Sequence, residues 1–196
     1  ENCEVVSFTM LDKETSIEIE KLGENGTHVI GALLAIMDGN NQIEQWVSDG
    51  TAHVIEAKLQ PGKTYTLKEI RPAPGYAFAD DIPFTVSEDG TIDMVQMKDY
   101  YTKVMIIKTD EEGNRVNGAV LQILDDNKKP VKASITSDGF TAGEDLIFTT
   151  SVNGTPITGQ LDADKTYYIR ELKSPTGYYV ASEDVEFVLN HDETLK

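Results

Sequence analysis

Apolar and polar residues alternate over short runs along the chain, as in Ile17 and Ile19 or Tyr65 and Leu67. Successive side chains of a strand point to opposite faces, so this alternation predicts β-strands with one buried face. Gly, Asn and Asp interrupt the runs roughly every ten residues, and no helical period is sustained. About seven short strands at this spacing are typical of a Greek-key β-sandwich. The pattern predicts an all-β protein.

The chain also contains an internal repeat. Lys21 and Lys108 end matching alternating runs, and they lie 87 positions apart. Glu69 and Glu171 lie 102 positions apart, and each precedes a turn that ends in Gly-Tyr and contains Pro. Because a repeat of this length corresponds to one structural unit, the fold class predicted is two tandem Greek-key sandwiches.

The repeat sets the domain organisation. We expect a first unit over residues 16–102 and a second unit over residues 103–196. The second copy is 15 residues longer, and we place the extra residues around 140–159, where Asn153-Gly154 predicts an added hairpin turn. The junction has no linker rich in Gly, Pro or Ser, so the two units should form a stiff rod rather than a flexible pair.

The N-terminal residues do not belong to the first unit. A Met-Leu-Asp sequence ends at Asp12, nine residues before Lys21. A similar Met-Lys-Asp sequence ends at Asp99, nine residues before Lys108. Residues 1–15 are therefore expected to be the last strand of a preceding repeat or an N-terminal extension, and Asp12 is a possible crosslink acceptor of that preceding domain.

Three residues of the first copy form a candidate reactive cluster: Lys21, Glu69 and Asp99. The first and last strands of a sandwich can be neighbours, which would bring Lys21 and Asp99 together inside the unit, opposite Glu69. Burial disfavours the charged forms of amines and carboxyls, so a neutral amine and a protonated acid become accessible together. Held in contact, they would react at an effective molarity of about 10⁵ M or more.

The predicted product is an isopeptide bond between Lys21 and Asp99, formed with loss of water. Glu69 would act as the catalytic proton shuttle. The alternative interpretation of these three residues is an ordinary ion-pair cluster without covalent chemistry.

The second copy repeats Lys108 and Glu171 but not the acceptor. An equivalent of Asp99 would fall beyond Lys196, so the second unit is expected to lack its last strand. Asn190 is a less favoured acceptor, because it aligns with the loop after the penultimate strand. A further alternative is strand addition from a neighbouring molecule, which would bring its Asp12 near Lys108.

Composition excludes several classes of function. The chain has 17 Lys and Arg against 34 Asp and Glu, a net charge of −17, so nucleic acid and anionic membrane surfaces are unfavourable partners. No apolar stretch approaches the length of a membrane span. Cys3 is the single cysteine, which excludes an internal disulfide, and no metal or cofactor motif is present. We therefore expect no cofactor.

These motifs resemble a known family. The Lys-x-Gly-Glu-Asn-Gly opening after the first strand, and the Glu followed by Pro-x-Gly-Tyr in each copy, are similar to Cna protein B-type domains of Gram-positive surface proteins and pilins. The resemblance covers nearly the whole chain. It implies a reverse immunoglobulin-like sandwich with an autocatalytic isopeptide bond. By motif position, Lys21 and Lys108 take the nucleophile role, Glu69 and Glu171 the catalytic role, and Asp99 the acceptor role.

The function expected from this resemblance is that of a structural stalk or pilin-like module. It would lie outside the cell at the bacterial surface, anchored to the cell wall through another region, with neighbouring repeats as partners. The alternative is an adhesin module that binds a host extracellular protein or glycan through the extra residues or the loops near Pro72 to Ala79. An enzyme is the least favoured class, since no nucleophile elbow, phosphate loop or metal motif occurs.

Overall fold

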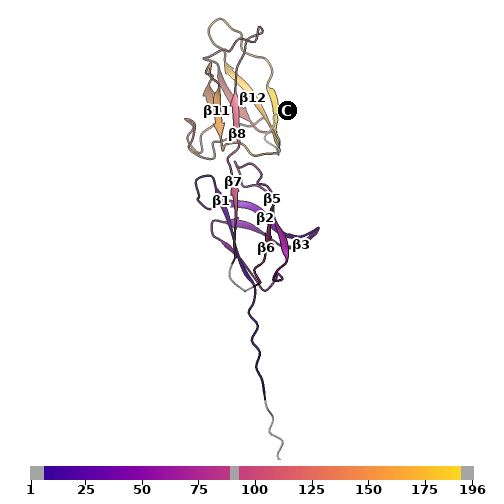
Figure 1. Cartoon of the computed structure of the whole chain (residues 1–196). Coiled ribbons are helices and arrows are strands. Elements are labelled where there is room, and N and C mark those ends of the chain that lie inside the picture. The colour runs from indigo at the N-terminus through magenta and orange to yellow at the C-terminus, as the bar shows by residue number, and fades with distance from the viewer. Residues whose placement is uncertain (1–6, 89–92, 191–196) are drawn as a thin grey trace, which may run out of the picture.

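The computed structural model describes residues 7–88 and 93–190. Two β-sandwich units follow one another end to end, and an extended N-terminal segment runs away from the first unit (Figure 1). The described residues form strands β1 to β13 and no helix. This confirms the predicted all-β class with two tandem units.

The first unit consists of two facing sheets. Its strands are β1 (Ser16–Gly23), β2 (Ile30–Asp38), β3 (Asn41–Asp49), β4 (His53–Glu56), β5 (Thr64–Arg71), β6 (Ile82–Thr85) and β7 (Asp93–Asp99). One sheet has the order β4-β1-β7 and the other β3-β2-β5-β6. β1 pairs antiparallel with β4 and parallel with β7. The first and last strands of this unit are therefore neighbours, as expected.

The alternation along β1 determines which of its side chains are buried. Ile17 and Ile19 are 0% and 1% exposed, and they share one core with Leu34 and Leu67 of the opposite sheet. Burying an aliphatic side chain of this size contributes about 1.5–3 kcal/mol. Lys21 follows on the same face, since side chains two positions apart share a face. The burial of the two isoleucines thus carries the lysine into the interior.

The second unit has a similar pair of sheets with fewer strands. Its strands are β8 (Lys103–Ile106), β9 (Val120–Leu124), β10 (Ile147–Thr149), β11 (Thr155–Thr158), β12 (Lys165–Lys173) and β13 (Val185–Leu189). They form a β11-β8 sheet and a β10-β9-β12-β13 sheet. No strand among residues 103–190 takes the place that β7 has in the first unit. The expected loss of a last strand concerns residues 191–196 and beyond, outside the described residues.

Equivalent hydrogen bonds locate the extra residues of the second unit. The Ala32 N–H donates to Ser48 Oγ at 3.0 Å, and the Ala119 N–H donates to Thr150 Oγ1 at 3.1 Å. Ala119 lies 87 positions after Ala32, and Thr150 lies 102 positions after Ser48. The extra residues therefore lie between Ala119 and Thr150, and the placement around 140–159 was wrong in its second half.

The connection between strands shows the same shift. Only Gly39 and Asn40 separate β2 from β3, whereas residues 125–146 separate β9 from β10. Asn153-Gly154 joins β10 to β11, which is the connection that Gly50 makes between β3 and β4 in the first unit. It is a turn that both units share and not an added one.

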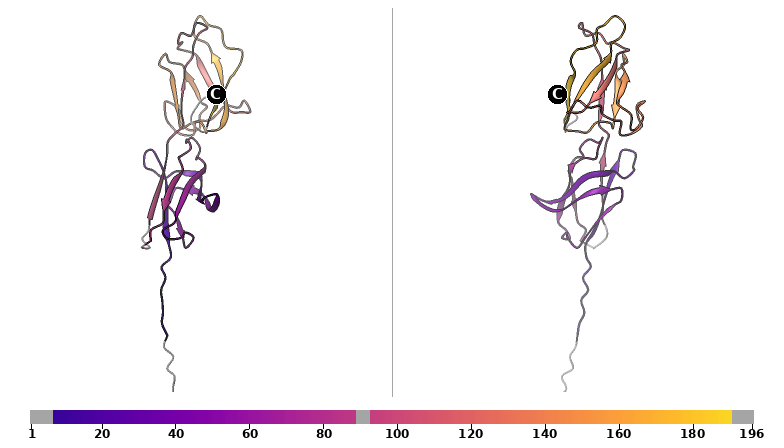
Figure 2. Two further views of the ribbon diagram at one scale, coloured as in Figure 1. Left: turned by 45° about the vertical axis from the view of Figure 1, so that its right-hand side comes forward. Right: turned by 180° about the vertical axis from the view of Figure 1, so that it is seen from behind.

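The two units are joined by a hydrogen-bonded junction. The Gly75 N–H donates to Asp162 Oδ1 at 2.8 Å, and Thr102 donates through its N–H to Gly75 O at 3.0 Å and through Oγ1 to Leu161 O at 2.6 Å. Tyr76 of the first unit stacks on Tyr101 with ring centroids 4.6 Å apart. Three views show the units in line (Figures 1 and 2). We expect these contacts to restrict bending at the junction.

Replacing Gly75 by alanine should loosen this junction. A Cβ at Gly75 would lie 2.4 Å from the backbone oxygen of Gly159 in the second unit. Overpacking of this kind costs about 1–3 kcal/mol, so the two units should separate and adopt a wider range of orientations. Small-angle X-ray scattering of Gly75→Ala should show a broader distance distribution than that of the wild type.

The matched control is Gly177→Ala, at the same position of the second unit. Both glycines have positive φ, 78° and 94°, so both substitutions carry the backbone cost of about 1–2 kcal/mol. A Cβ at Gly177 meets nothing within 4 Å. Gly177→Ala should therefore scatter like the wild type. Identical curves for Gly75→Ala and the wild type would mean that the junction does not depend on this close approach.

Candidate functional site

The predicted residues Lys21, Glu69 and Asp99 meet inside the first unit, and we call them the buried cluster. Lys21 lies on β1, Asp99 ends the neighbouring β7, and Glu69 lies on β5 of the opposite sheet. The parallel register pairs Gly23 with Asp99, which brings the Asp99 side chain next to Lys21 on the inner face. Lys21, Glu69 and Asp99 are 2%, 4% and 1% exposed.

Lys21 contacts both carboxyls of the cluster. Its Nζ lies 2.8 Å from Glu69 Oε1 and donates a hydrogen bond to Asp99 Oδ1. The other oxygen of Glu69, Oε2, accepts the Ala79 N–H at 2.8 Å, which fixes the orientation of that carboxyl. Asp99 Oδ2 is buried and has no hydrogen-bond partner among the described residues. An orphaned carboxyl oxygen in a dry interior is costly unless the group is protonated or reacts.

The environment of Asp99 favours its protonated form. Burial, together with the smaller effect of the negative charge of Glu69, raises the pKa of the Asp99 carboxyl to about 7, although the Lys21 ammonium acts in the opposite direction. The protonated form of Asp99 is therefore accessible near neutral pH. A protonated acid is the form from which a hydroxyl can leave as water, so the cluster holds an amine and an activated acceptor in contact.

The second unit reproduces part of this arrangement. Glu171 on β12 is 8% exposed, and its Oε2 accepts the Ala181 N–H at 2.7 Å, as Glu69 Oε2 accepts that of Ala79. Lys108 is not in the interior. Its Nζ donates to the backbone oxygen of Thr109 at 3.2 Å near the surface. Among the ion pairs of the described residues, none joins Lys108 to Glu171.

The other predicted acceptors lie elsewhere. Asn190 directly follows β13, the position expected for a loop after the penultimate strand. An acceptor beyond Lys196 is outside the described residues. Asp12 lies in the N-terminal segment, which extends away from the first unit (Figure 1), whereas Lys108 follows β8 in the second unit. The structure thus assembles the cluster of the first unit. Among the described residues, no ion pair connects Lys108 to an acidic residue that could serve as its acceptor.

Sequence reasoning missed the backbone groups that orient the two glutamates. Ala79 and Ala181 each lie ten residues after the glutamate they hold. Any residue type except proline can supply a backbone N–H, so residue identity carries almost no signal for this role. Only the constant offset of 102 between the two alanines could have indicated it.

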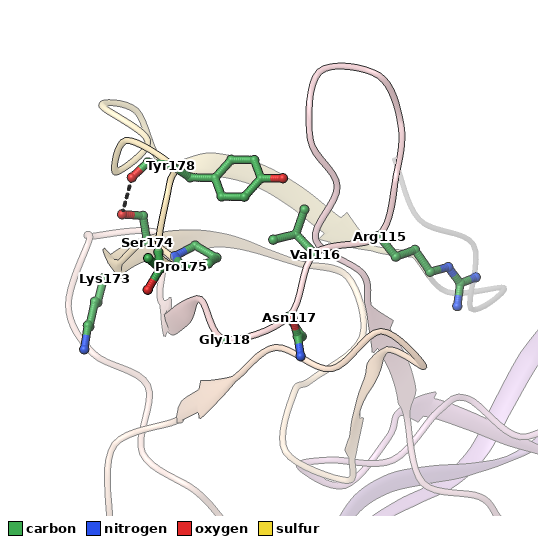
Figure 3. Close-up of a pocket in the computed structure, with 9 residues that line it drawn as sticks. Arg115, Val116, Asn117, Gly118, Lys173, Ser174, Pro175 and Tyr178 are labelled. Carbon is green, nitrogen blue, oxygen red and sulfur yellow. Dashed lines mark hydrogen bonds between the residues drawn. The ribbon is translucent and has the colours of Figure 1, made fainter.

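A separate pocket of about 450 Å³ lies at the end of the second unit that faces away from the first. Arg115, Lys173 and Tyr178 line it, and Ser174 Oγ donates to Tyr178 O at 2.8 Å (Figure 3). The turn at residues 175–178 corresponds to the turn through which the first unit contacts the second. The pocket shares no residue with the buried cluster or with Glu171.

Two other features were sought in the part of the chain that the structure describes. No group of three or more His, Cys, Asp and Glu side chains among residues 7–88 and 93–190 could hold a metal ion. In the same residues, no helix is long and apolar enough to cross a membrane.

Two sandwiches in tandem, each with an inward-facing glutamate held by a backbone amide, define a class of repeated immunoglobulin-like modules. The family model of the SpaA prealbumin-like fold domain matches residues 15–101 and again residues 102–196. The chain therefore belongs to this family. The match agrees with the resemblance to two tandem Cna B-type domains.

Solved structures that are similar to this chain include a Bacillus protein and two pilins. The Bacillus anthracis TIE protein is 22% identical with a TM-score of 0.46, over 91% of this chain and 32% of that one. The shaft pilin spaA from Lactobacillus rhamnosus GG is 16% identical with a TM-score of 0.40, over 91% and 94%. A streptococcal ancillary pilin is 18% identical with a TM-score of 0.43, over 92% and 60%.

This chain spans about a third of the length of the TIE protein. No curated protein matches the chain.

Proposed function

We propose that this chain is a structural stalk or pilin-like module of a Gram-positive cell-surface protein. An intramolecular isopeptide bond between Lys21 and Asp99 would stabilise its first unit. The observation that carries the proposal is the contact of Lys21 Nζ with the carboxyls of both Glu69 and Asp99 inside the sandwich. Membership of the prealbumin-like family and the end-to-end arrangement of the units support the structural role.

The bond forms by condensation of a neutral amine with a protonated acid. Lys21 Nζ attacks the Asp99 carboxyl carbon, a C–N bond forms, the C–OH bond breaks, and one water leaves. Glu69 takes a proton from the attacking nitrogen and gives it to the departing hydroxyl, and it ends the reaction unchanged. General acid–base assistance of this kind is typically worth 10²–10⁴-fold in rate. The reaction happens once per molecule, so the module is not an enzyme.

A crosslink suits an extracellular module of this composition. The chain has a single cysteine, so no disulfide can stabilise either unit from within. An amide between the first and last strands ties the two ends of the unit together, and it needs no oxidant. Pulling on the N-terminus and on the junction would then load a covalent bond rather than the hydrogen bonds between β1 and β7.

The adhesin alternative has no such supporting observation. One of its proposed binding regions, the loops from Pro72 to Ala79, lies at the junction, where Gly75 donates a hydrogen bond to Asp162 of the second unit. This leaves neighbouring repeats as the partners that the surface of the first unit supports.

The intact mass of the denatured chain tests the proposal. The wild type should be lighter by one water than its sequence mass, and Glu69→Ala should have the full mass. Peptide mapping should find the lost water in a branched peptide that joins Lys21 to Asp99. A folded wild type at full mass would overturn the proposed bond.

Glu171→Ala is the control variant. It removes the corresponding glutamate of the second unit, and it should still lose one water because the cluster of the first unit is intact. If the wild type lost ammonia in addition to water, a second bond would join Lys108 to an asparagine, for which Asn190 is the candidate.

A further inference from the structure

The acceptor Asp99 lies at the very end of a strand. Its pairing with Gly23 is the last pair between β7 and β1, and residues 100–102 lead directly from it to β8 of the second unit. The ends of strands open more readily than their middles, because fewer hydrogen bonds hold them. The position of the Asp99 carboxyl next to Lys21 therefore depends on how residues 100–102 are held.

The glycine–tyrosine turn of the first unit holds residues 100–102 from one side. The Ala77 N–H donates to Tyr100 O at 2.9 Å, and the Thr102 N–H donates to Gly75 O at 3.0 Å. Two backbone hydrogen bonds thus continue the support of β7 beyond its last pairing with β1. The end of β7 and this turn are therefore held together.

The second unit holds the same residues from the other side. Thr102 is 1% exposed, its Oγ1 donates to Leu161 O at 2.6 Å, and its backbone oxygen accepts the Gly159 N–H at 2.8 Å. The Gly75 N–H donates to Asp162 Oδ1 at 2.8 Å, so the second unit holds the turn as well. Both supports of the end of β7 are therefore in contact with the second unit.

Tyr76 reaches from the junction to the buried cluster. Its Oη lies 3.2 Å from the point that a Cβ on Gly23 would occupy, and Gly23 is the residue of β1 that pairs with Asp99. Burial raises the pKa of the Tyr76 hydroxyl, with smaller effects of Tyr101 and of the negative charge of Asp99. Because the Tyr76 ring stacks on Tyr101, its position depends on the same residues that follow Asp99.

We propose that the second unit is a positioning element for the buried cluster: docked on residues 100–102 and on the turn beside them, it keeps the end of β7 where Asp99 meets Lys21. The inference rests on the proposed isopeptide bond and concerns when that bond forms. The contacts of Asp162 and Thr102 are with the junction, so these two residues act through the position of Asp99. A misplacement of about 1 Å can slow a reaction between positioned groups about a hundredfold. The first unit should therefore close its bond rapidly only after the second unit has folded and docked.

A variant of the second unit tests this coupling. Asp162→Ala removes the acceptor of the Gly75 N–H and leaves every residue of the first unit unchanged. The full chain, dissolved in urea before the bond has formed, is diluted into buffer, and samples are denatured at intervals for intact mass. The first unit of Asp162→Ala should lose its water at least about tenfold more slowly than that of the wild type. Asp162→Asn keeps an oxygen that can accept the Gly75 N–H, so it should restore most of the rate.

A matched pair of valine variants separates docking from the stability of the second unit. Thr102→Val removes the hydroxyl that donates to Leu161 O, with little change in size, and it should also slow the loss of water at least about tenfold. Thr150→Val is the control, because Thr150 is 4% exposed and its hydroxyl donates to Val116 O at 3.2 Å within the second unit. Thr150→Val should lose its water at the wild-type rate. Trp46, the single tryptophan, lies in the first unit, and its fluorescence must show that this unit is folded in every variant.

The outcomes distinguish a failure of this inference from a failure of the proposed function. If Asp162→Ala and Thr102→Val lose their water as fast as the wild type does, the inference is overturned and the proposed bond stands. An equally slow Thr150→Val would overturn the inference too, because a less stable second unit would then explain the effect without docking. A folded wild type that keeps its full mass would overturn the proposed bond, and this inference with it.

Discussion

The first unit of a Glu69→Gln variant is expected to be less stable than that of the wild type by about 4–5 kcal/mol. The bond it lacks joins residues 78 positions apart, and a crosslink of that span lowers the entropy of the unfolded chain by this amount. Glutamine keeps the size of Glu69 and an oxygen that can accept the Ala79 N–H, so packing changes little. The loss should therefore report the bond itself.

Trp46 gives a direct measurement of this difference. It is the single tryptophan, it lies on β3, and it stacks on His53 with ring centroids 4.2 Å apart. Its fluorescence during denaturant unfolding therefore follows the first unit alone. Glu171→Gln, the matched change in the second unit, should leave the Trp46 transition where it is in the wild type. Equal transitions for the wild type and Glu69→Gln, with the wild type one water lighter, would contradict stabilisation by the bond.

The buried cluster could be predicted from sequence because two independent signals agree on it. Alternation places Lys21 on the same face as Ile17 and Ile19. The repeat identifies Glu69 as a recurring position, and Asp99 has its counterpart in Asp12 of the N-terminal segment. Since the first and last strands of a sandwich unit can pair, these signals predicted that the three side chains lie close together. The parallel direction of β7 and its register with β1 were beyond this reasoning, because alternation is the same in both directions.

The extra residues of the second unit show where such reasoning fails. In the sequence, the repeat offset is 87 as far as Gly118 and 102 from Lys165 onward. The extra residues could therefore lie anywhere between these two positions. Asn-Gly is a strong hairpin signal, and the extra residues were placed around Asn153-Gly154 for this reason. A hairpin signal reports a turn but not whether that turn is new. The side-chain hydrogen bond to Thr150, which has its equivalent at Ser48, resolves the position.

The rate of bond formation should fall about tenfold for each pH unit below about 7 and stay nearly constant just above it. The reactive pair consists of a neutral amine and a protonated acid. It holds one more proton than a neutral amine with a carboxylate. The ion pair of an ammonium and a carboxylate holds the same number. The two forms interconvert without uptake of a proton, so their ratio does not depend on pH. Below the Asp99 pKa of about 7, a second proton is bound and the reactive form is depleted.

Refolding measures this profile. The chain, dissolved in urea before the bond has formed, is diluted into buffers from pH 5 to pH 8, and samples are denatured at intervals for intact mass. Trp46 fluorescence must show a folded first unit at each pH, and Asp99→Ala, which has no acceptor, should keep its full mass throughout. A rate that instead rises as the pH falls from 7 to 5 would mean that protonation of Asp99 alone limits the reaction. In that case the amine must be neutral already in the folded unit, and Glu69 would have no proton to remove before attack.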